Sequence, residues 1–131
     1  MDDLAKLLAG NEISGISLAY VGDAVWELFV RKYYVARSLN VRTLNRKVKA
    51  LVNAKKQSAL YRRMLPELAP QWREYGRKGK NANIKTYPRS CTQLEYREAT
   101  AFEAVIASLY INGKTAMIGE IVKKFAEEET Q

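Results

Sequence analysis

The sequence predicts an all-α fold, on the basis of its apolar periodicity, its helix-capping residues and its length. Apolar side chains recur every three to four positions along most of the chain, and no convincing alternating strand pattern appears. Ser, Thr, Asp or Asn precedes most of the apolar helical stretches, as expected at helix starts. The chain has 131 residues, the size of one ordinary domain, so we expect a single domain over residues 1–131.

The first part of the chain predicts a short helix followed by a long one. Asp3 can cap the short helix, which Gly10 ends. Ser14 or Ser17 then starts a helix that continues to about Arg37. Apolar residues cover most of the circumference of this long helix, which is typical of a helix at the centre of a domain.

Two further helices are predicted before the middle of the chain. The first covers residues 40–52, and Asn53 can cap the second, which runs to residue 65. Pro66 ends that second helix, because proline has no amide hydrogen to donate and cannot continue a helix.

The remaining chain predicts a short helix, a loop and two more helices. Residues 70–76 form the short helix, and residues 76–88, with two Gly, four bases and no apolar period, form a mobile loop. Thr92 caps a second strongly apolar helix, which ends at Asn112. The last helix covers residues 115–128.

The composition excludes several kinds of chemistry. The chain has one cysteine and no histidine, which excludes a disulfide framework, the common zinc sites and hydrolases with a catalytic histidine. Cys91 is most simply a reduced thiol without a special role, as expected in a reducing compartment. Acid–base or metal chemistry in this chain must therefore depend on carboxylates.

Basic residues are concentrated in the middle of the chain. The net charge is +8, and residues 31–97 contain 18 basic and three acidic residues, whereas the flanks contain four basic and 11 acidic residues. Such a separation indicates a surface for a polyanion, most commonly a nucleic acid. The alternative is a basic surface that serves only solubility.

The sequence gives no indication of a membrane or export segment. The chain begins with Met1-Asp2-Asp3, whose charge is opposite to that of a signal peptide. The most apolar run, residues 16–30, contains Asp23 and Glu27 and is short for a bilayer span. We therefore expect a cytoplasmic protein without a membrane partner.

Two carboxylates occur in unusually apolar surroundings. Asp23 and Glu103 each lie within one of the two most apolar helices. An ionised carboxylate removed from water must be paired, hydrogen-bonded or bound to a metal. The structural alternative is a polar stripe or a pairing with Arg31 or Arg97. Gly22 favours a site, because glycine within a helix usually marks close approach of another backbone or a ligand.

These features together lead to one hypothesis. Two carboxylates from two central helices suit Mg²⁺, which prefers oxygen ligands and keeps several waters. A phosphodiester of a nucleic acid could complete the coordination, with the metal polarising the phosphate and activating water.

Two segments carry a specific resemblance to a known family. Residues 18–31, Leu-Ala-Tyr-Val-Gly-Asp-Ala-Val-Trp-Glu-Leu-Phe-Val-Arg, resemble the signature helix of the ribonuclease III catalytic domain. Residues 100–110, Thr-Ala-Phe-Glu-Ala-Val-Ile-Ala-Ser-Leu-Tyr, resemble its second acidic motif. The resemblance is closest to Mini-III ribonucleases, which have no separate double-stranded-RNA-binding domain and also contain a basic, Asn-containing segment like residues 77–83.

The resemblance implies a homodimeric endoribonuclease with a ribonuclease III-like helical fold that cuts both strands of duplex RNA. Asp23 and Glu103 would be the catalytic residues and would bind Mg²⁺, for which Mn²⁺ can substitute. The resemblance further implies maturation of the large-subunit (23S) ribosomal RNA precursor, and it leaves assistance by a ribosomal protein open. The candidates for contacts to the RNA are Arg77, Lys78, Lys80, Asn81, Asn83 and Lys85; the alternative is that they form only a solvated loop.

The chain departs from the larger members of the family at two positions. Those enzymes have a further carboxylate one turn before Asp23 and another before Glu103, where this chain has Ala19 and Thr100. Mini-III ribonucleases share this reduction, so it does not indicate an inactive enzyme. It does predict one well-held ion, with a second recruited alongside the substrate.

Other readings of the sequence remain. Trp26, Tyr33, Tyr34 and Trp72 could form a two-fold interface or belong to the core of one chain. A non-catalytic RNA-binding or ribosome-associated protein could retain the same fold, although the presence of both carboxylates argues against it. A helical adaptor protein would explain neither the carboxylates nor the basic segment.

Overall fold

The computed structural model describes residues 2–37 and 40–129, so residues 1, 38–39 and 130–131 of the predicted domain lie outside it. The described residues form helices and no strand, which confirms the all-α prediction. None of these helices combines the length and the apolar character that crossing a bilayer requires. The elements are α1 (Asp3–Ala9), α2 (Gly15–Val35), α3 (Val41–Leu51), α4 (Ala54–Met64), the 3₁₀ turn η1 (Leu65–Glu67), α5 (Pro70–Lys80), α6 (Gln93–Ile111) and α7 (Thr115–Glu129).

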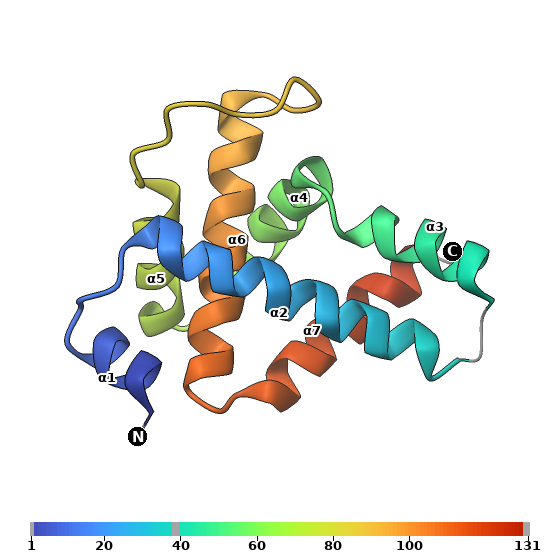
Figure 1. Cartoon of the computed structure of the whole chain (residues 1–131), viewed down its shortest axis with the longest axis horizontal. Coiled ribbons are helices and arrows are strands. Elements are labelled where there is room, and N and C mark those ends of the chain that lie inside the picture. Colours follow the sequence, from blue (N-terminus) through green and yellow to red (C-terminus); the bar gives the residue numbers. More distant parts are fainter. Residues whose placement is uncertain (1, 38–39, 130–131) are drawn as a thin grey trace.

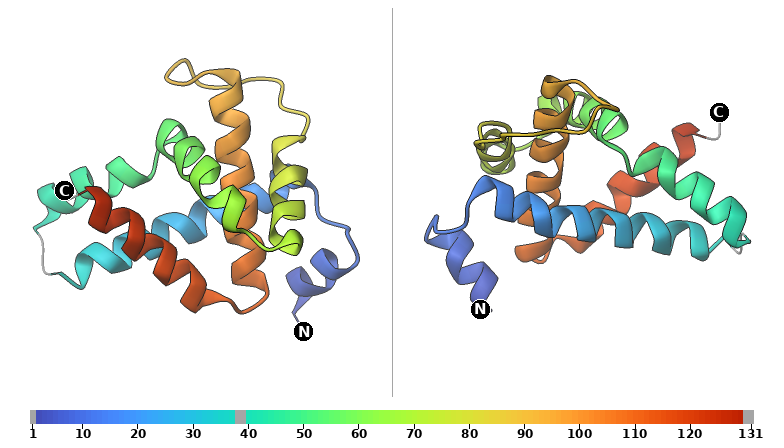
Figure 2. Two further views of the ribbon diagram at one scale, coloured as in Figure 1. Left: turned by 180° about the vertical axis from the view of Figure 1, so that it is seen from behind. Right: turned by 45° about the horizontal axis from the view of Figure 1, so that its top comes forward.

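Helix α6 forms the centre of the molecule. Helices α2, α4 and α5 all pack against it, and α2 crosses it (Figure 1). Helices α3 and α7 pack against α2 and against each other, at the opposite end of the molecule from α5 (Figure 2). Helix α2 contacts α3, α5, α6 and α7, so its predicted central place is confirmed for part of its surface only. Leu28 and Val35 of α2 are more than half exposed, at 51% and 59%.

Aromatic residues fill the core around the crossing of α2 and α6. Trp26 and Phe102 meet edge to face, with ring centroids 4.8 Å apart. Trp26, Tyr34 and Trp72 are all buried within this one chain, and Tyr33 is partly buried against the same core. A role for the three buried residues in a two-fold interface is therefore wrong, because the chain's own packing covers them.

The sequence predicts most helix starts correctly. The side chains of Ser14, Asn40 and Asn53 accept hydrogen bonds from backbone amides in the first turns of α2, α3 and α4. Thr92 forms a reciprocal capping box at the start of α6. The exception is α1, where Asp2 rather than Asp3 is the cap, accepting from the amide of Ala5 at 2.8 Å.

Helix α5 is longer than the sequence predicts. It continues past Gly76 to Lys80, so the expected loop over residues 76–88 begins only at Asn81. The reason is close packing on α6: a Cβ atom at Gly79 would lie 2.8 Å from Cβ of Ala104 and 2.9 Å from the carbonyl oxygen of Thr100. This contact stabilises a helix that its glycines alone would weaken. The irregular segment that follows passes over the N-terminal end of α6 (Figure 1).

Candidate active site

A pocket of about 510 Å³ opens beside the crossing of α2 and α6. Four parts of the chain form its walls: the N-terminal half of α2, the start of α4, the segment that follows α5, and α6. The residues that line it are Ile16, Ala19, Tyr20, Asp23, Ala54, Gln57, Asn83, Ile84, Lys85, Thr86, Tyr96, Ala99, Thr100 and Glu103. Both carboxylates that the sequence singles out are therefore in one pocket.

Gly22 explains how the two carboxylates come together. A Cβ atom at this position would lie 1.7 Å from the carbonyl oxygen of Glu103, so any side chain would collide with the backbone of α6. The two helix backbones are thus in direct contact at Gly22. The next residue along α2 is Asp23, whose side chain consequently lies beside that of Glu103.

The environment of Glu103 strongly disfavours its ionised form. Burial, and then a hydrogen bond and the charge from Asp23, raise the pKa of Glu103 to about 9. Glu103 is partly buried, whereas Asp23 is exposed, so the expectation that both carboxylates are enclosed holds only in part. Glu103 therefore keeps its proton at neutral pH unless a cation compensates the negative charge.

The alternative pairing with arginine is wrong. Arg31 forms its salt bridge with Glu27, one turn away on the same helix. Arg97 donates to the carbonyl oxygens of Lys80 and Ala82, at 3.1 and 3.2 Å. Among residues 2–37 and 40–129, no basic side chain forms a salt bridge with Asp23 or Glu103.

The donor set fits a hard divalent cation. Mg²⁺, which binds oxygen ligands and keeps several waters, would supply the positive charge that lets Glu103 ionise beside Asp23 at neutral pH. Within the described residues, no group of three or more Asp, Glu, His or Cys side chains gathers to hold a metal. The protein thus offers few ligands, and most positions around such a cation remain for water or for phosphate oxygens.

The two positions that lack a family carboxylate lie in the same pocket. Ala19 and Thr100 both line it, on α2 and α6. The Thr100 hydroxyl donates to the carbonyl oxygen of Tyr96 at 2.8 Å, a bond within its own helix. Neither residue replaces the negative charge that a carboxylate would supply there.

The six candidate RNA-contacting residues divide into two groups. Asn83 and Lys85 line the pocket and are exposed. The others lie on or at the end of α5, away from the pocket lining: Arg77 pairs with Glu74, Lys78 Nζ donates to Asn11 Oδ1 at 2.8 Å, Lys80 lies near Glu98, and Asn81 follows the last helical residue. The structure thus brings two of the six to the carboxylates.

Two buried polar residues near the site, Gln57 and Glu98, are not predicted from the sequence. Gln57 lines the pocket from α4 and is buried, with 4% of its surface exposed. Glu98 is buried on α6, where it accepts from Ser58 and Arg62 at 2.9 Å, and the bonds from Arg62 hold its pKa below the usual value. One signal could have revealed Gln57: it lies three, four and seven residues before Leu60, Tyr61 and Met64, on the apolar face of its helix.

Comparisons with known proteins agree with this fold. The family model of the Ribonuclease III domain matches residues 16–114 of the sequence. A Mini-ribonuclease 3-like protein from Ilyobacter polytropus is 50% identical over 90% of this chain and 93% of its own length. A Mini-ribonuclease 3 from Symbiobacterium thermophilum is 34% identical over 86% of this chain and 87% of its own length. A crystal structure of a Fusobacterium nucleatum protein, 46% identical, superposes with a TM-score of 0.82 over 90% of this chain and 95% of that one.

The helical fold and the match to the family model define a ribonuclease III domain, and the protein is an endoribonuclease of that type. More narrowly, the chain belongs to the Mini-ribonuclease 3 group of the ribonuclease III family.

Proposed function

We propose that this protein is a Mg²⁺-dependent endoribonuclease that cleaves both strands of duplex RNA, with Asp23 and Glu103 as its catalytic residues. The observation that carries the proposal is the pairing of these two carboxylates, from crossing helices, in one pocket. Two carboxylates placed together repel each other when both are ionised, and such pairs occur mostly at functional sites. In the ribonuclease III family that function is the cleavage of RNA.

The two carboxylates hold the cation, which Mn²⁺ can replace. Bound Mg²⁺ supplies Lewis acidity to the phosphate and lowers the pKa of water. Asp23 is exposed, so an RNA phosphate can reach the pair from solvent. The direct contact of Gly22 with the backbone of α6 keeps the two helices, and with them the two carboxylates, close together. The chain has no histidine to act as a general base, which is consistent with a nucleophile derived from water.

The rim of the pocket contributes the contacts to the RNA backbone. Duplex RNA is recognised mainly through phosphates and 2′-hydroxyl groups. Lys85 supplies positive charge and Asn83 an uncharged donor and acceptor beside the carboxylates. Arg77, Lys78, Lys80 and Asn81 extend this basic surface along the end of α5.

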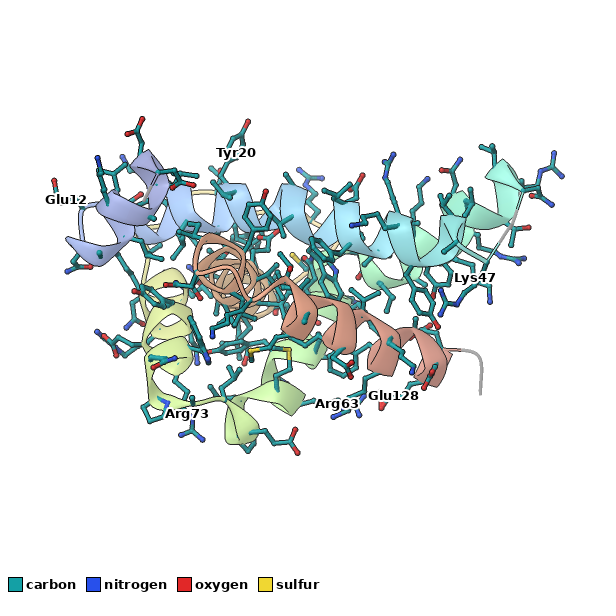
Figure 3. The ribbon with its side chains drawn as sticks, turned by 90° about the horizontal axis from the view of Figure 1, so that it is seen from below. Glu12, Tyr20, Lys47, Arg63, Arg73 and Glu128 are labelled. Carbon is teal, nitrogen blue, oxygen red and sulfur yellow. The ribbon has the colours of Figure 1, made fainter. Side chains whose placement is uncertain are left out.

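The proposed enzyme is a homodimer that associates through α2. Large apolar side chains at positions 16, 20, 28 and 35 of this helix are exposed, and they recur at helical spacing. Tyr20 is 82% exposed and points away from the other helices (Figure 3). An apolar stripe of this kind on a monomer favours a protein interface. A two-fold pair of sites would cut the two strands of a duplex at offset positions.

The proposed substrate in the cell is the precursor of the large-subunit (23S) ribosomal RNA, processed in the cytoplasm. The support for this step is the membership in the Mini-ribonuclease 3 group together with the net charge of +8.

A cleavage assay with paired substrates tests the proposal. The purified chain is incubated with a labelled RNA duplex, or with each strand alone, in Mg²⁺ or in EDTA. We expect paired cuts with short 3′ overhangs only for the duplex in Mg²⁺. Cleavage of the single strands at the same rate, or cleavage in EDTA, would contradict it. Duplex binding without any cleavage in Mg²⁺ would instead indicate a non-catalytic RNA-binding protein.

A further inference from the structure

One buried polar atom in the pocket has no partner. Within the part of the chain that the structure describes, the buried side-chain atoms without a hydrogen-bond partner are the Gln57 Nε2 and the Tyr34 hydroxyl. Only Gln57 lines the pocket with the two carboxylates. A buried amide donor without an acceptor is destabilising, and native structures rarely tolerate one without a reason.

The neighbouring residue shows that this helix does satisfy its buried polar groups. Ser58 is as deeply buried as Gln57, at 2% against 4% exposed, and its hydroxyl donates to Glu98 at 2.9 Å. Arg62 completes the bonding of the same carboxylate. The buried polar groups of Ser58 and Glu98 between α4 and α6 are thus satisfied, whereas the Nε2 of the adjacent Gln57 is not.

The pocket is also the place where an acceptor would arrive. Asp23 and Glu103 line it, and a cation with an RNA phosphate bound there would bring ionised carboxylate and phosphate oxygens close to the amide. Groups beside metal ligands commonly donate such hydrogen bonds, which orient the ligands. Amide N–H groups are stronger donors to charged oxygens than to neutral ones.

We propose that Gln57 is a positioning residue of the active site, whose Nε2 donates a hydrogen bond to an anionic oxygen of the loaded site. The acceptor is a carboxylate oxygen of Asp23 or Glu103, or a phosphate oxygen of the RNA backbone. This inference rests on the proposed function, because it needs the cation or the RNA to be bound at this pocket. It explains why the side-chain amide of Gln57 is buried without a hydrogen-bond partner.

Two binding measurements without catalysis test the proposal on Gln57→Leu, which removes the donor at similar size. The first measures Mn²⁺ affinity by electron paramagnetic resonance without RNA. The second measures affinity for an RNA duplex by fluorescence anisotropy in EDTA, where cleavage does not occur. We expect at least one affinity to fall by about tenfold. A fall for Mn²⁺ identifies a carboxylate oxygen as the acceptor, and a fall for RNA identifies a phosphate oxygen.

Ser58→Ala is the matched control. It breaks a satisfied bond to Glu98, so it should lower the melting temperature and leave both affinities unchanged. Gln57→Leu should melt no lower than the wild-type chain, because it removes an unsatisfied group. If the leucine variant does not fold, Gln57→Met provides the same test with an unbranched side chain. Unchanged affinities for both ligands in a folded Gln57 variant would overturn the proposal.

Asp23→Asn distinguishes a failure of the role of Gln57 from a failure of the proposed metal site. If Asp23→Asn loses Mn²⁺ binding while Gln57→Leu keeps both affinities, only the role of Gln57 is wrong. If Asp23→Asn binds Mn²⁺ as well as the wild-type chain does, the proposed metal site itself is wrong.

Discussion

Gly22 lies directly against the carbonyl oxygen of Glu103, so close that a Cβ atom at position 22 would be 1.7 Å from it. One catalytic carboxylate in the proposed mechanism is therefore on the residue whose backbone forms this contact, and the other is on the residue that follows the glycine. The distance between the two helices and the distance between the two acids depend on the same contact.

Gly22→Ala should consequently destabilise the fold and damage the site. The added methyl group cannot fit without separating α2 from α6, and overpacking of this kind costs about 3 kcal/mol or more. We expect the melting temperature to fall by roughly 10 °C in calorimetry. Gly119→Ala is the control: no atom lies within 4 Å of a Cβ there, so the change should be neutral or stabilise α7. Equal melting temperatures for the two variants would contradict the close contact.

Glu103→Gln should stabilise the metal-free protein in a pH-dependent way. Glu103 has a pKa of about 9 in the folded chain against an ordinary value of 4.5. Between these pH values the folded state keeps a proton that the unfolded state has lost, so stability falls as the pH rises. Glutamine does not titrate and avoids this loss. In EDTA, the gain in melting temperature should therefore be near zero at pH 4.5 and reach several degrees at pH 8.5.

Addition of Mg²⁺ supplies the control for this pH dependence. The cation binds the folded wild-type chain and should raise its melting temperature. Glu103→Gln lacks the charge and should respond little. If Glu103→Gln raised the melting temperature in EDTA by the same amount at the lower and the higher pH, Glu103 would not keep its proton in the folded chain.

Lys85→Ala should weaken duplex binding more than Arg77→Ala. Lys85 lines the pocket, whereas Arg77 pairs with Glu74 on α5. Each phosphate contact that is lost reduces the slope of log affinity against log salt by about one unit. We expect this change for Lys85→Ala in anisotropy titrations at several salt concentrations, with an unchanged melting temperature. If only Arg77→Ala flattens the slope, the RNA passes along α5 rather than over the pocket rim.

Leu28→Glu should dissociate the proposed homodimer. Leu28 is 51% exposed on α2, where a charge would oppose burial in an apolar interface. Leu94→Glu is the control, since Leu94 is 49% exposed, nearly as much as Leu28, and lies on α6 rather than in the apolar stripe of α2. Light scattering after size-exclusion chromatography should give the monomer mass for the first variant and the dimer mass for the second. Dimers in both cases would place the interface elsewhere.

The sequence predicts most of the architecture because local signals determine it. Ser14, Asn40, Asn53 and Thr92 mark helix starts by a bond between each side chain and a nearby amide, which needs no tertiary contact. Gly22 predicts a tertiary contact from the sequence alone, because a glycine inside an apolar helix usually allows another backbone to approach the helix closely.

The errors of the sequence reading arise where tertiary packing outweighs local preference. Gly76 looks like the start of a loop, yet the contact of Gly79 with Ala104 keeps α5 helical to Lys80. Trp26 looks like a possible interface residue until Phe102, from a distant part of the chain, covers it. Gln57 is a polar residue that follows Lys55 and Lys56, and it is buried because it shares the apolar face of α4 that packs against α6.

The central claim is that Asp23 and Glu103 together bind the cation that makes RNA cleavage possible. The most direct measurement is the single-turnover rate of duplex cleavage at saturating Mg²⁺ for Asp23→Asn, Glu103→Gln and Glu27→Gln. Glu27 is the matched control, an acid one turn beyond Asp23 that pairs with Arg31. The account predicts a near-complete loss of cleavage for the first two variants, because they lack a charge that holds the metal, and near wild-type rates for the third. Substantial cleavage by either folded Asp23→Asn or Glu103→Gln would contradict it.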